Sequence, residues 1–377
     1  MYMSTTTPRR HYAKRYIRRD NPPNFELTER AIRINTEVCR RPLIRKDQLR
    51  NLFPEISDRP FDQIISNLFH NGFIARPRQQ QELHNQVNGS LPTYLTPDRR
   101  GVHLHSAFFT DPVATPKYSQ DNNRMTWGYM RHQHTTTTTL INYQTGAQTV
   151  PNFSFLSEPD LWNRYAPNNV INQPTLRLED TRKLMAHDFI ANPPEVRGRS
   201  AKIPLQLSAH LEWPVHIPGQ AGLSTTPIYA RTQPDGYFAQ HHARTDFFFL
   251  ESDEGTETIL PGKSTRHSMQ LFYDTSLFAK YLVYIAAFRK RAHVKQFGIP
   301  SFQVITVTTT PRRVSQIIDK LHAILTRDPL HIHPNFFLFT DRNTLTQYDN
   351  NPYHPDHHHK NLAGDDVQLH SASSSSA

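Results

Sequence analysis

The residues that decide the fold are DRPFDQIISNLFHNGFIA, positions 58–75 of the 377-residue chain. Their apolar side chains recur at steps of three and four, which predicts an amphipathic helix over residues 59–71. These side chains are Phe61, Ile64, Ile65, Leu68 and Phe69. Gly72 suits the left-handed position that ends many helices, and residues 73–75 have the composition of a β-strand. This stretch therefore predicts a helix followed directly by a strand.

Two shorter helical patterns precede this helix, and a second strand follows it. The first pattern spans Leu27 to Val38 and the second spans Lys46 to Phe53. Residues 93–96 can return as the partner strand, with residues 76–90 as the connecting wing. Three helices closed by a β-hairpin predict a winged helix over residues 25–110. Winged helices also serve as protein-contact modules, so contact with DNA and contact with a protein both stay open.

The third helix of such a fold enters the major groove of double-stranded DNA. Its polar residues can then hydrogen-bond base edges or phosphates. We expect the DNA contacts from the helix and the wing to be Arg59, Gln63, Ser66, Asn67, His70, Arg76 and Arg78.

Residues 1–24 are expected to be a disordered basic arm. Residues 1–50 hold 13 Lys or Arg and 5 Asp or Glu, so most of the net charge of +10 lies there. A basic end attracts nucleic acid, because each neutralised phosphate releases counterions. The alternative is a solvated tail that only aids solubility. The expected DNA contacts of the arm are Arg9, Arg10, Lys14, Arg15, Arg18 and Arg19.

The composition excludes several classes of protein. A single cysteine, Cys39, cannot form an internal disulfide or a Cys-based zinc cluster, which favours a reducing cytoplasm. The longest nearly apolar run, residues 281–288, is too short to cross a bilayer, and the basic N-terminus does not resemble a secretory signal. No glycine-rich phosphate loop appears, which argues against an ATP-driven motor.

The rest of the chain divides by composition into three parts. Residues 111–174 are rich in Thr, Asn, Gln and Pro and are expected to be a variable connector. Residues 175–345 alternate apolar strand-like runs with helical patterns, which predicts an α/β (α+β) domain with a mixed sheet. Residues 346–377, rich in histidine and then in serine, are expected to be a disordered tail.

Acidic residues mark one end of two predicted strands in the second domain. Asp235 lies at the start of one strand, and Glu251 and Asp253 follow the apolar run of residues 247–250. Residues two apart on a strand share a face, so Glu251 and Asp253 are expected to converge with Asp235. Carboxylates grouped in this way suit Mg²⁺ or Mn²⁺, although solvated acids at an ordinary strand end are the alternative.

The chain resembles the replication-relaxation family, which is related to MobC-type plasmid relaxases. The resemblance lies in short segments, in order along the chain: Tyr94-Leu95-Thr96, His187, Pro234-Asp235-Gly236, the run Phe249 to Glu257, Lys280-Tyr281, and Val304 to Thr308 followed by Arg312 or Arg313. It implies a restriction-endonuclease-like PD-(D/E)XK fold in the second domain. It also implies a role in plasmid mobilisation or replication, with nicking at a transfer origin.

Carried over, the resemblance makes Asp235 and Glu251 the metal-binding acids. The nuclease pattern has a lysine two residues after the second acid, where this chain has Asp253. Lys280 can supply that cation from the following helix, as can Lys263 or Arg266. A relaxase nucleophile would be a tyrosine. Tyr281 and Tyr284 have helical spacing and are first interpreted as core residues.

The leading hypothesis is a metal-dependent DNA-nicking or processing protein of a mobile element, acting on plasmid origin DNA. A second hypothesis, from another class, is a non-catalytic plasmid DNA-binding regulator, which would have no need of the three acids. A third is an accessory scaffold that recruits a relaxase or coupling protein of the relaxosome.

Overall fold

The computed structural model describes residues 16–41, 43–77, 80, 92–109, 126–165, 174–181, 183–195, 206–216, 221–262, 276–325 and 332–369. The chain forms two compact units. Unit 1 comprises residues 1–138 and 168–201, and unit 2 comprises residues 139–167 and 202–377. None of the described helices is both long enough and apolar enough to cross a membrane.

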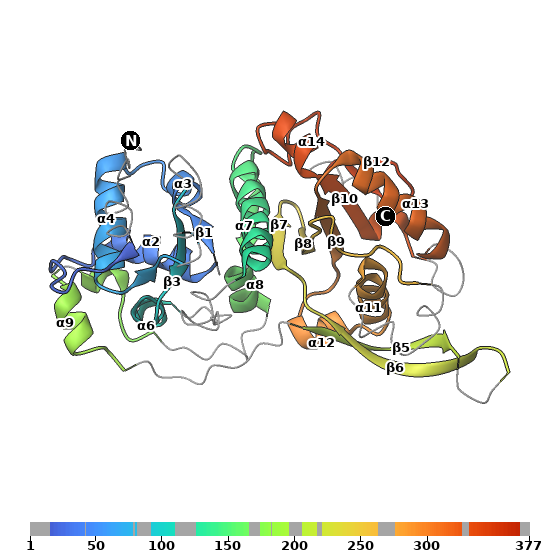
Figure 1. Cartoon of the computed structure of the whole chain (residues 1–377), viewed down its shortest axis with the longest axis horizontal. Helices are drawn as coiled ribbons and strands as arrows, with labels where there is room; N and C mark the ends of the chain where they lie inside the picture. The colour runs from blue at the N-terminus through green and yellow to red at the C-terminus, as the bar shows by residue number, and fades with distance from the viewer. Residues whose placement is uncertain are drawn as a thin grey trace, which may run out of the picture. The chain divides into compact units, whose positions relative to one another are not determined.

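Unit 1 is built from helices around a small antiparallel sheet (Figure 1). Strand β3 lies in the middle of the sheet, between β1 and β2. The register pairs Ile44 with Leu95 and Ile74 with Pro97. The elements are α2 (Glu29–Cys39), β1 (Ile44–Arg45), α3 (Lys46–Asn51), α4 (Asp58–His70), β2 (Ile74–Ala75), β3 (Tyr94–Pro97), α6 (Arg99–Phe108) and α9 (Ala186–Ala191).

Helix α4 forms where the apolar spacing predicts it. Phe61, Ile65 and Leu68 are each no more than 1% exposed and face the core of unit 1. Gly72 follows the helix with a φ of +80°, the left-handed conformation that the sequence predicts and that glycine adopts without steric cost. The chain then enters β2, whose residues pair with β3. The predicted helix and the predicted hairpin strands are therefore confirmed.

Unit 1 is completed by a segment that comes much later in the chain. Leu27 N–H donates to Leu184 O over 2.8 Å, and Ala186 N–H donates to Phe25 O over 2.9 Å. Phe189 of α9 packs against Phe73, with ring centroids 6.0 Å apart. The segment that carries α9 is thus part of the core of unit 1.

Unit 2 is organised around a seven-stranded mixed sheet, which confirms the mixed α+β class predicted for the second domain. Its strands lie in the order β12-β11-β10-β9-β8-β7-β4. Strand β7 is antiparallel to both of its neighbours, β4 and β8, whereas β8, β9 and β10 run parallel. The strands are β4 (Ser154–Ser157), β7 (Gly236–His241), β8 (Thr245–Ser252), β9 (Gln303–Thr308), β10 (Phe337–Asp341), β11 (His359–Asn361) and β12 (Asp366–Val367).

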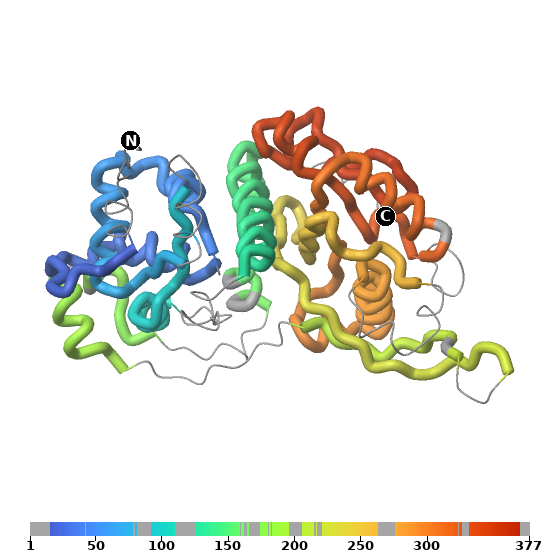
Figure 2. The backbone as a smooth tube through the Cα atoms, in the orientation of Figure 1, coloured from blue at the N-terminus to red at the C-terminus, as the bar shows by residue number. Residues whose placement is uncertain are grey.

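Helices connect the parallel strands and cover the sheet (Figure 1). They are α11 (Leu277–Arg289) with α12 (Ala292–Phe297), between β8 and β9, and α13 (Pro311–Leu325), between β9 and β10. A separate hairpin of β5 (Leu207–Val215) and β6 (Ser224–Thr232) extends away from the sheet (Figure 2). It packs on α11 through Trp213, whose ring centroid lies 5.6 Å from that of Phe278.

The predicted connector over residues 111–174 is wrong for its described part. Residues 127–147 form the helix α7 (Trp127–Ala147), and residues 154–165 form β4 and α8 (Glu158–Tyr165). The threonine run in α7 has high β-propensity, but burial overrides it, since Thr135, Thr136 and Thr137 are each under 5% exposed. Threonine can also bond its own helix, as the Thr138 hydroxyl does by donating to His134 O over 2.7 Å.

The predicted disordered tail over residues 346–377 is also wrong as far as residue 369. After α14 (Arg342–Gln347), the chain returns to the sheet as β11, which pairs with β10. The histidines that indicate a solvated tail lie in the core instead. His359 is fully buried, and its Nε2 lies 2.6 Å from the Tyr143 hydroxyl. Burial lowers the pKa of His359 well below its usual value, so the ring packs as a neutral group. Residues 370–377 lie outside the described residues.

Candidate functional site

Asp235 lies at the edge of the sheet where β7 begins and β8 ends. Its backbone N–H donates to Leu250 O over 2.9 Å, which extends the β7–β8 ladder by one residue. Its Oδ2 accepts a hydrogen bond of 2.7 Å from the backbone N–H of Ser252. Strands β7 and β8 pair antiparallel. This pairing brings the Asp235 carboxylate to the end of the strand that carries Glu251.

Glu251 is 1% exposed and is held by two side chains from α11. Lys280 Nζ donates to its Oε2 over 2.9 Å, and the Tyr284 hydroxyl donates to its Oε1. Positions four apart on a helix share one face, so α11 presents both donors to the end of β8. Tyr281 and Tyr284 are fully buried, as the helical spacing predicts, but the sequence does not indicate the hydrogen bond from Tyr284 to the site.

The electrostatics of the site follow from its burial. Burial raises the pKa of Glu251 to about 7. The Asp235 charge adds to this upward shift, and the Lys280 ammonium opposes it only in part. Burial alone lowers the pKa of Lys280, but the negative charges of Glu251, Glu257 and Asp235 outweigh it, and the net shift is upward. Lys280 is therefore a firmly protonated ammonium among carboxylates.

Glu257 is a member of the site that the sequence pattern does not indicate. Its Oε2 accepts a hydrogen bond of 3.2 Å from Lys280 Nζ. Strand alternation can relate Glu251 to Asp253, but it ends at Gly255, where φ is +76° and the chain turns. The turn brings Glu257 back to the lysine. Residues 254 and 257 are both glutamates, so the sequence does not indicate which of them faces Lys280.

Asp253 has a different role from the one that the sequence predicts. Arg313 Nε and the Thr308 hydroxyl each donate to its Oδ2 over 2.8 Å, and Gly255 N–H donates to its Oδ1 over 3.0 Å. Its side chain is fully buried. A carboxylate has about four acceptor positions, and these bonds occupy most of them. The predicted convergence of three acids on a metal is therefore replaced by an ion pair that joins Asp253 to α13.

The remaining acids fit a metal site of two carboxylates. Among the described residues, no group of three or more His, Cys, Asp or Glu side chains is arranged to hold a metal ion. Mg²⁺ does not require such a group, because it is commonly held by one or two carboxylates together with water and substrate phosphates. Asp235 and Glu251 lie close enough that the charge of one shifts the pKa of the other. They are the two acids that could hold such an ion.

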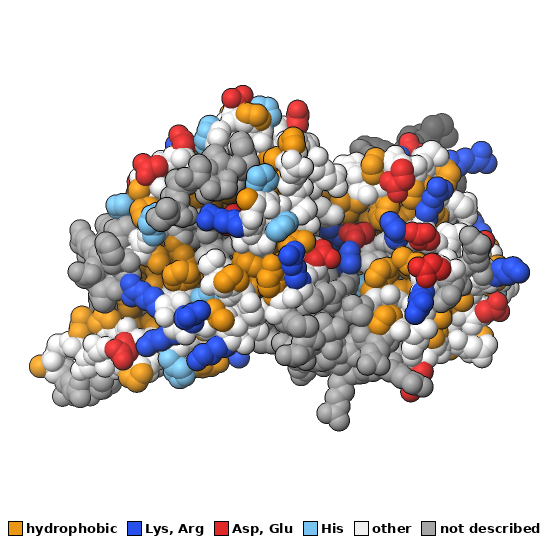
Figure 3. Space-filling model, turned by 180° about the vertical axis from the view of Figure 1, so that it is seen from behind, with side chains coloured by type: hydrophobic (Ala, Val, Ile, Leu, Met, Phe, Trp, Pro, Cys, Tyr) orange, Lys and Arg blue, Asp and Glu red, His pale blue; other side chains and the backbone are white. Residues whose placement is uncertain are grey.

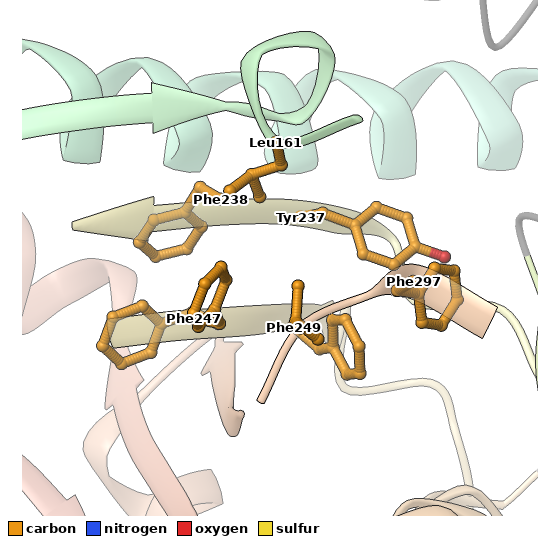
Figure 4. A pocket seen from close by; sticks show the side chains of 8 residues that line it. Leu161, Tyr237, Phe238, Phe247, Phe249 and Phe297 are labelled. Atoms are coloured by element: carbon orange, nitrogen blue, oxygen red, sulfur yellow. The ribbon is translucent and has the colours of Figure 1, made fainter. Parts of the chain in front are cut away.

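A small apolar pocket lies elsewhere along β7 and β8 (Figure 4). Aromatic side chains from both strands and from α12 line it, including Tyr237, Phe247 and Phe297. No Asp, Glu, Lys or Arg side chain is among its lining residues. We assign it to core packing, and the charged strand end remains the candidate site.

In unit 1, α4 places the predicted DNA-contact residues together on its polar side. Arg59 and Gln63 are exposed, and Ser66, Asn67 and His70 are half-buried. Gln63 Nε2 donates to Asn67 Oδ1 over 2.9 Å along the helix surface. Arg76, directly after β2, stacks on Phe69 with its guanidinium carbon 4.1 Å from the ring centroid. Arg78 lies outside the described residues.

The basic arm is only partly described, and one of its arginines has a structural role. Arg18 Nε donates to Phe69 O over 2.9 Å, its Nη2 donates to Ile74 O over 3.0 Å, and it pairs with Asp98. Arg18 therefore braces the end of α4, whereas the sequence predicts that it belongs to a disordered arm. Arg19 is exposed, and its backbone N–H donates to His70 Nδ1 over 3.2 Å. Arg9, Arg10, Lys14 and Arg15 lie outside the described residues.

The end of α4 has a positive electrostatic environment. Burial lowers the pKa of His70, and the charges of Arg19, Arg76 and Arg18 lower it further. On the face of the molecule in Figure 3, Lys and Arg side chains are interspersed with Asp and Glu side chains.

Comparison with known protein families finds none that matches this chain. Neither the curated proteins nor the solved structures contain a match.

Proposed function

We propose that this protein binds double-stranded DNA through unit 1 and nicks it by metal-dependent hydrolysis in unit 2. The observation that carries the proposal is the group of three charged side chains at the end of β8. Asp235 enters it from β7, Glu251 from β8 and Lys280 from α11. Two carboxylates with a nearby ammonium form a minimal set for metal-assisted attack of water on a phosphodiester.

The order of elements in unit 2 supports a restriction-endonuclease-like core. Strands β4, β7 and β8 lie side by side, with β7 antiparallel to both neighbours, and α11 then crosses over to β9, which lies parallel to β8. In such a core the paired acids lie at the start of the second of three neighbouring antiparallel strands and at the end of the third. Asp235 and Glu251 occupy these two positions, which accords with the resemblance to the replication-relaxation family.

Lys280 supports the proposal by compensating for the departure from the nuclease motif. The residue two positions after Glu251 is Asp253, but Lys280 Nζ reaches Glu251 Oε2 from the helix. Mg²⁺ or Mn²⁺ bound by Asp235 and Glu251 would activate water and neutralise charge on the phosphate. The protein itself supplies the ammonium that orients groups around Glu251, and Tyr284 fixes the other oxygen of that carboxylate.

The arrangement of unit 1 supports its interpretation as a winged helix. The order α2-β1-α3-α4-β2-β3, with β3 central in the sheet, is the one expected for that fold. We propose α4 as the recognition helix. The bases would be contacted by Arg59, Gln63 and Asn67, since these polar side chains can donate to or accept from base edges in the major groove.

The test is a nicking assay on supercoiled plasmid DNA with Mg²⁺ or Mn²⁺. We expect the full chain to produce open circles and Asp235→Asn to lower the rate by at least about 100-fold. Asparagine keeps an oxygen for the Ser252 N–H but removes the charge. Asp246→Asn is the matched control, since Asp246 lies at the other end of β8 and pairs with Arg244. If the full chain makes no nick with either metal, the nicking function is wrong.

One observation favours a second candidate, a non-catalytic plasmid DNA-binding regulator. Lys280 already neutralises much of the charge of Glu251 and Glu257, as an internal cation does in a purely structural cluster. Under this alternative the full chain binds DNA with the same affinity with and without divalent metal. Calorimetric titration with Mn²⁺ separates the two candidates. The nicking protein should release or take up heat on binding Mn²⁺, and Asp235→Asn should abolish that heat. The regulator should give no binding heat in either form.

A further inference from the structure

The four carboxylates near the end of β8 differ in how their oxygens are used. Both oxygens of Glu251 accept hydrogen bonds, and so do both oxygens of Asp253. Asp235 Oδ2 accepts from a backbone N–H. Glu257 Oε1 is buried and has no hydrogen-bond partner among the described residues, while its Oε2 accepts from Lys280. A buried carboxylate oxygen without a protein partner is costly unless it binds something else.

The backbone of Glu257 is fixed by a neighbouring ion pair. Arg313 Nη2 donates to Glu257 O, and the same arginine binds Asp253 through its Nε over 2.8 Å. Asp253 in turn accepts from Gly255 N–H, so the loop of residues 253–257 is tied at both ends. The next residue, Thr258, bridges to Ser276 at the start of α11. Glu257 is therefore held in place beside Lys280.

The charges around Glu257 suit a group that accepts a proton. Burial raises the pKa of Glu257 above its usual value, although Lys280 opposes the shift. A partly desolvated carboxylate binds a proton more strongly than a carboxylate on the surface. Lys280 is not available for this role, because its ammonium donates to both Glu251 and Glu257.

We propose that Glu257 is the proton acceptor of the site and that Lys280 is the fixed ammonium that holds it. This proposal rests on the nicking function proposed above. In the step, a water oxygen forms a bond to the phosphodiester phosphorus, and the bond from phosphorus to the leaving sugar oxygen breaks. The electron pair of that bond leaves on the sugar oxygen, which solvent protonates. The proton of the attacking water goes to Glu257 Oε1.

The experiment measures plasmid nicking with Mn²⁺ and, separately, Mn²⁺ affinity by calorimetry, both on the full chain. We expect Glu257→Gln and Glu257→Ala to lower the nicking rate by roughly 100-fold or more. Mn²⁺ affinity should stay within about threefold of the wild type, since the metal is assigned to Asp235 and Glu251. Added formate should restore part of the rate of Glu257→Ala, because it can enter the space left by the side chain and accept the proton. A purely structural loss would not respond to formate.

Glu254→Gln is the matched control, since Glu254 lies in the same loop and pairs with Arg342 away from Lys280. It should nick at close to the wild-type rate. If Glu257→Gln is as active as Glu254→Gln, the proton acceptor is another group and the nicking function still stands. If the rate and the Mn²⁺ affinity of Glu257→Gln fall together, Glu257 is a metal ligand and the proposal is overturned. If the wild type itself makes no nick, both proposals fail.

Discussion

At the scale of single residues, Lys280 supplies the positive charge at the charged end of β8. It is the cation shared by Glu251 and Glu257, and the pKa of each of these carboxyls is raised by burial. The sequence places a cation somewhere near the acids but leaves three candidates open, of which Lys263 and Arg266 lie outside the described residues. Helical spacing is the feature that distinguishes Lys280, because it lies four residues before Tyr284 on a helix packed against β8.

Removing the Lys280 charge should destabilise the protein. In Lys280→Met, Glu251 stays buried without its cation, and removing one partner of a buried pair costs roughly 3 kcal/mol. The measurement is urea unfolding of the full chain near neutral pH. Lys320→Met, on the exposed side of α13, is the control and should change the unfolding free energy by less than about 0.5 kcal/mol. Equal unfolding midpoints for the two variants would show that Lys280 does not stabilise the fold.

At the scale of elements, unit 1 depends on a close approach of α6 to its neighbours. Asn35 Nδ2 donates to Gly101 O over 2.7 Å, so the side chain of α2 meets the backbone of α6 directly. A Cβ atom at Gly101 would lie 1.9 Å from Phe73 O and 2.6 Å from Asn35 Oδ1. Glycine is required there because any side chain would push the two helices and β2 apart.

Gly101→Ala should therefore lower the stability of unit 1, even though alanine favours helices. Overpacking of this kind costs roughly 1–3 kcal/mol, which exceeds the gain of about 1 kcal/mol from helix propensity. The control is Gly128→Ala in α7, where an added Cβ meets no atom within 4 Å. That variant should be neutral or slightly more stable. Thermal melting of the full chain measures both, and a Gly101→Ala midpoint at or above the wild type would contradict the argument.

The elements also show what the sequence could and could not predict. The spacing of Phe61, Ile65 and Leu68 predicts α4 because one helix face is buried and the opposite face is solvated. The same method fails for α7, whose threonines are buried around much of the helix and leave no apolar stripe. It fails again for His359, because a neutral buried histidine and a solvated one look alike in a sequence. Long-range packing decides both cases.

For the acids of the candidate site, the sequence predicts that Asp235 and Glu251 meet at the strand end. It does not predict that Asp253 pairs with Arg313 while Glu257 contacts Lys280, because this arrangement depends on Arg313. The arginine lies 60 residues after Asp253 and reaches it only through the folded sheet. A distant contact thus decides that Asp253 is held in an ion pair.

At the scale of the whole molecule, the net charge of +10 predicts strongly salt-dependent DNA binding. The arm residues Arg9, Arg10, Lys14 and Arg15 can be replaced together by alanine without changing Arg18. We expect the slope of log affinity against log salt to fall in magnitude by up to about 3.6, which is about 0.9 for each phosphate that the arm no longer neutralises. Fluorescence anisotropy with duplex DNA measures the slope. An unchanged slope would assign the arm to solubility alone.

Helix α9 belongs to unit 1 but lies far along the chain from the rest of that unit, which affects folding during synthesis. The ribosome synthesises the chain from its N-terminus. Phe73 can pack against Phe189 only after residue 189 has been synthesised. Residues 139–167, which belong to unit 2, emerge in between. The first unit therefore cannot finish folding before part of the second has been synthesised. A chain truncated after residue 138 would lack α9 and leave Phe73 without its contact to Phe189.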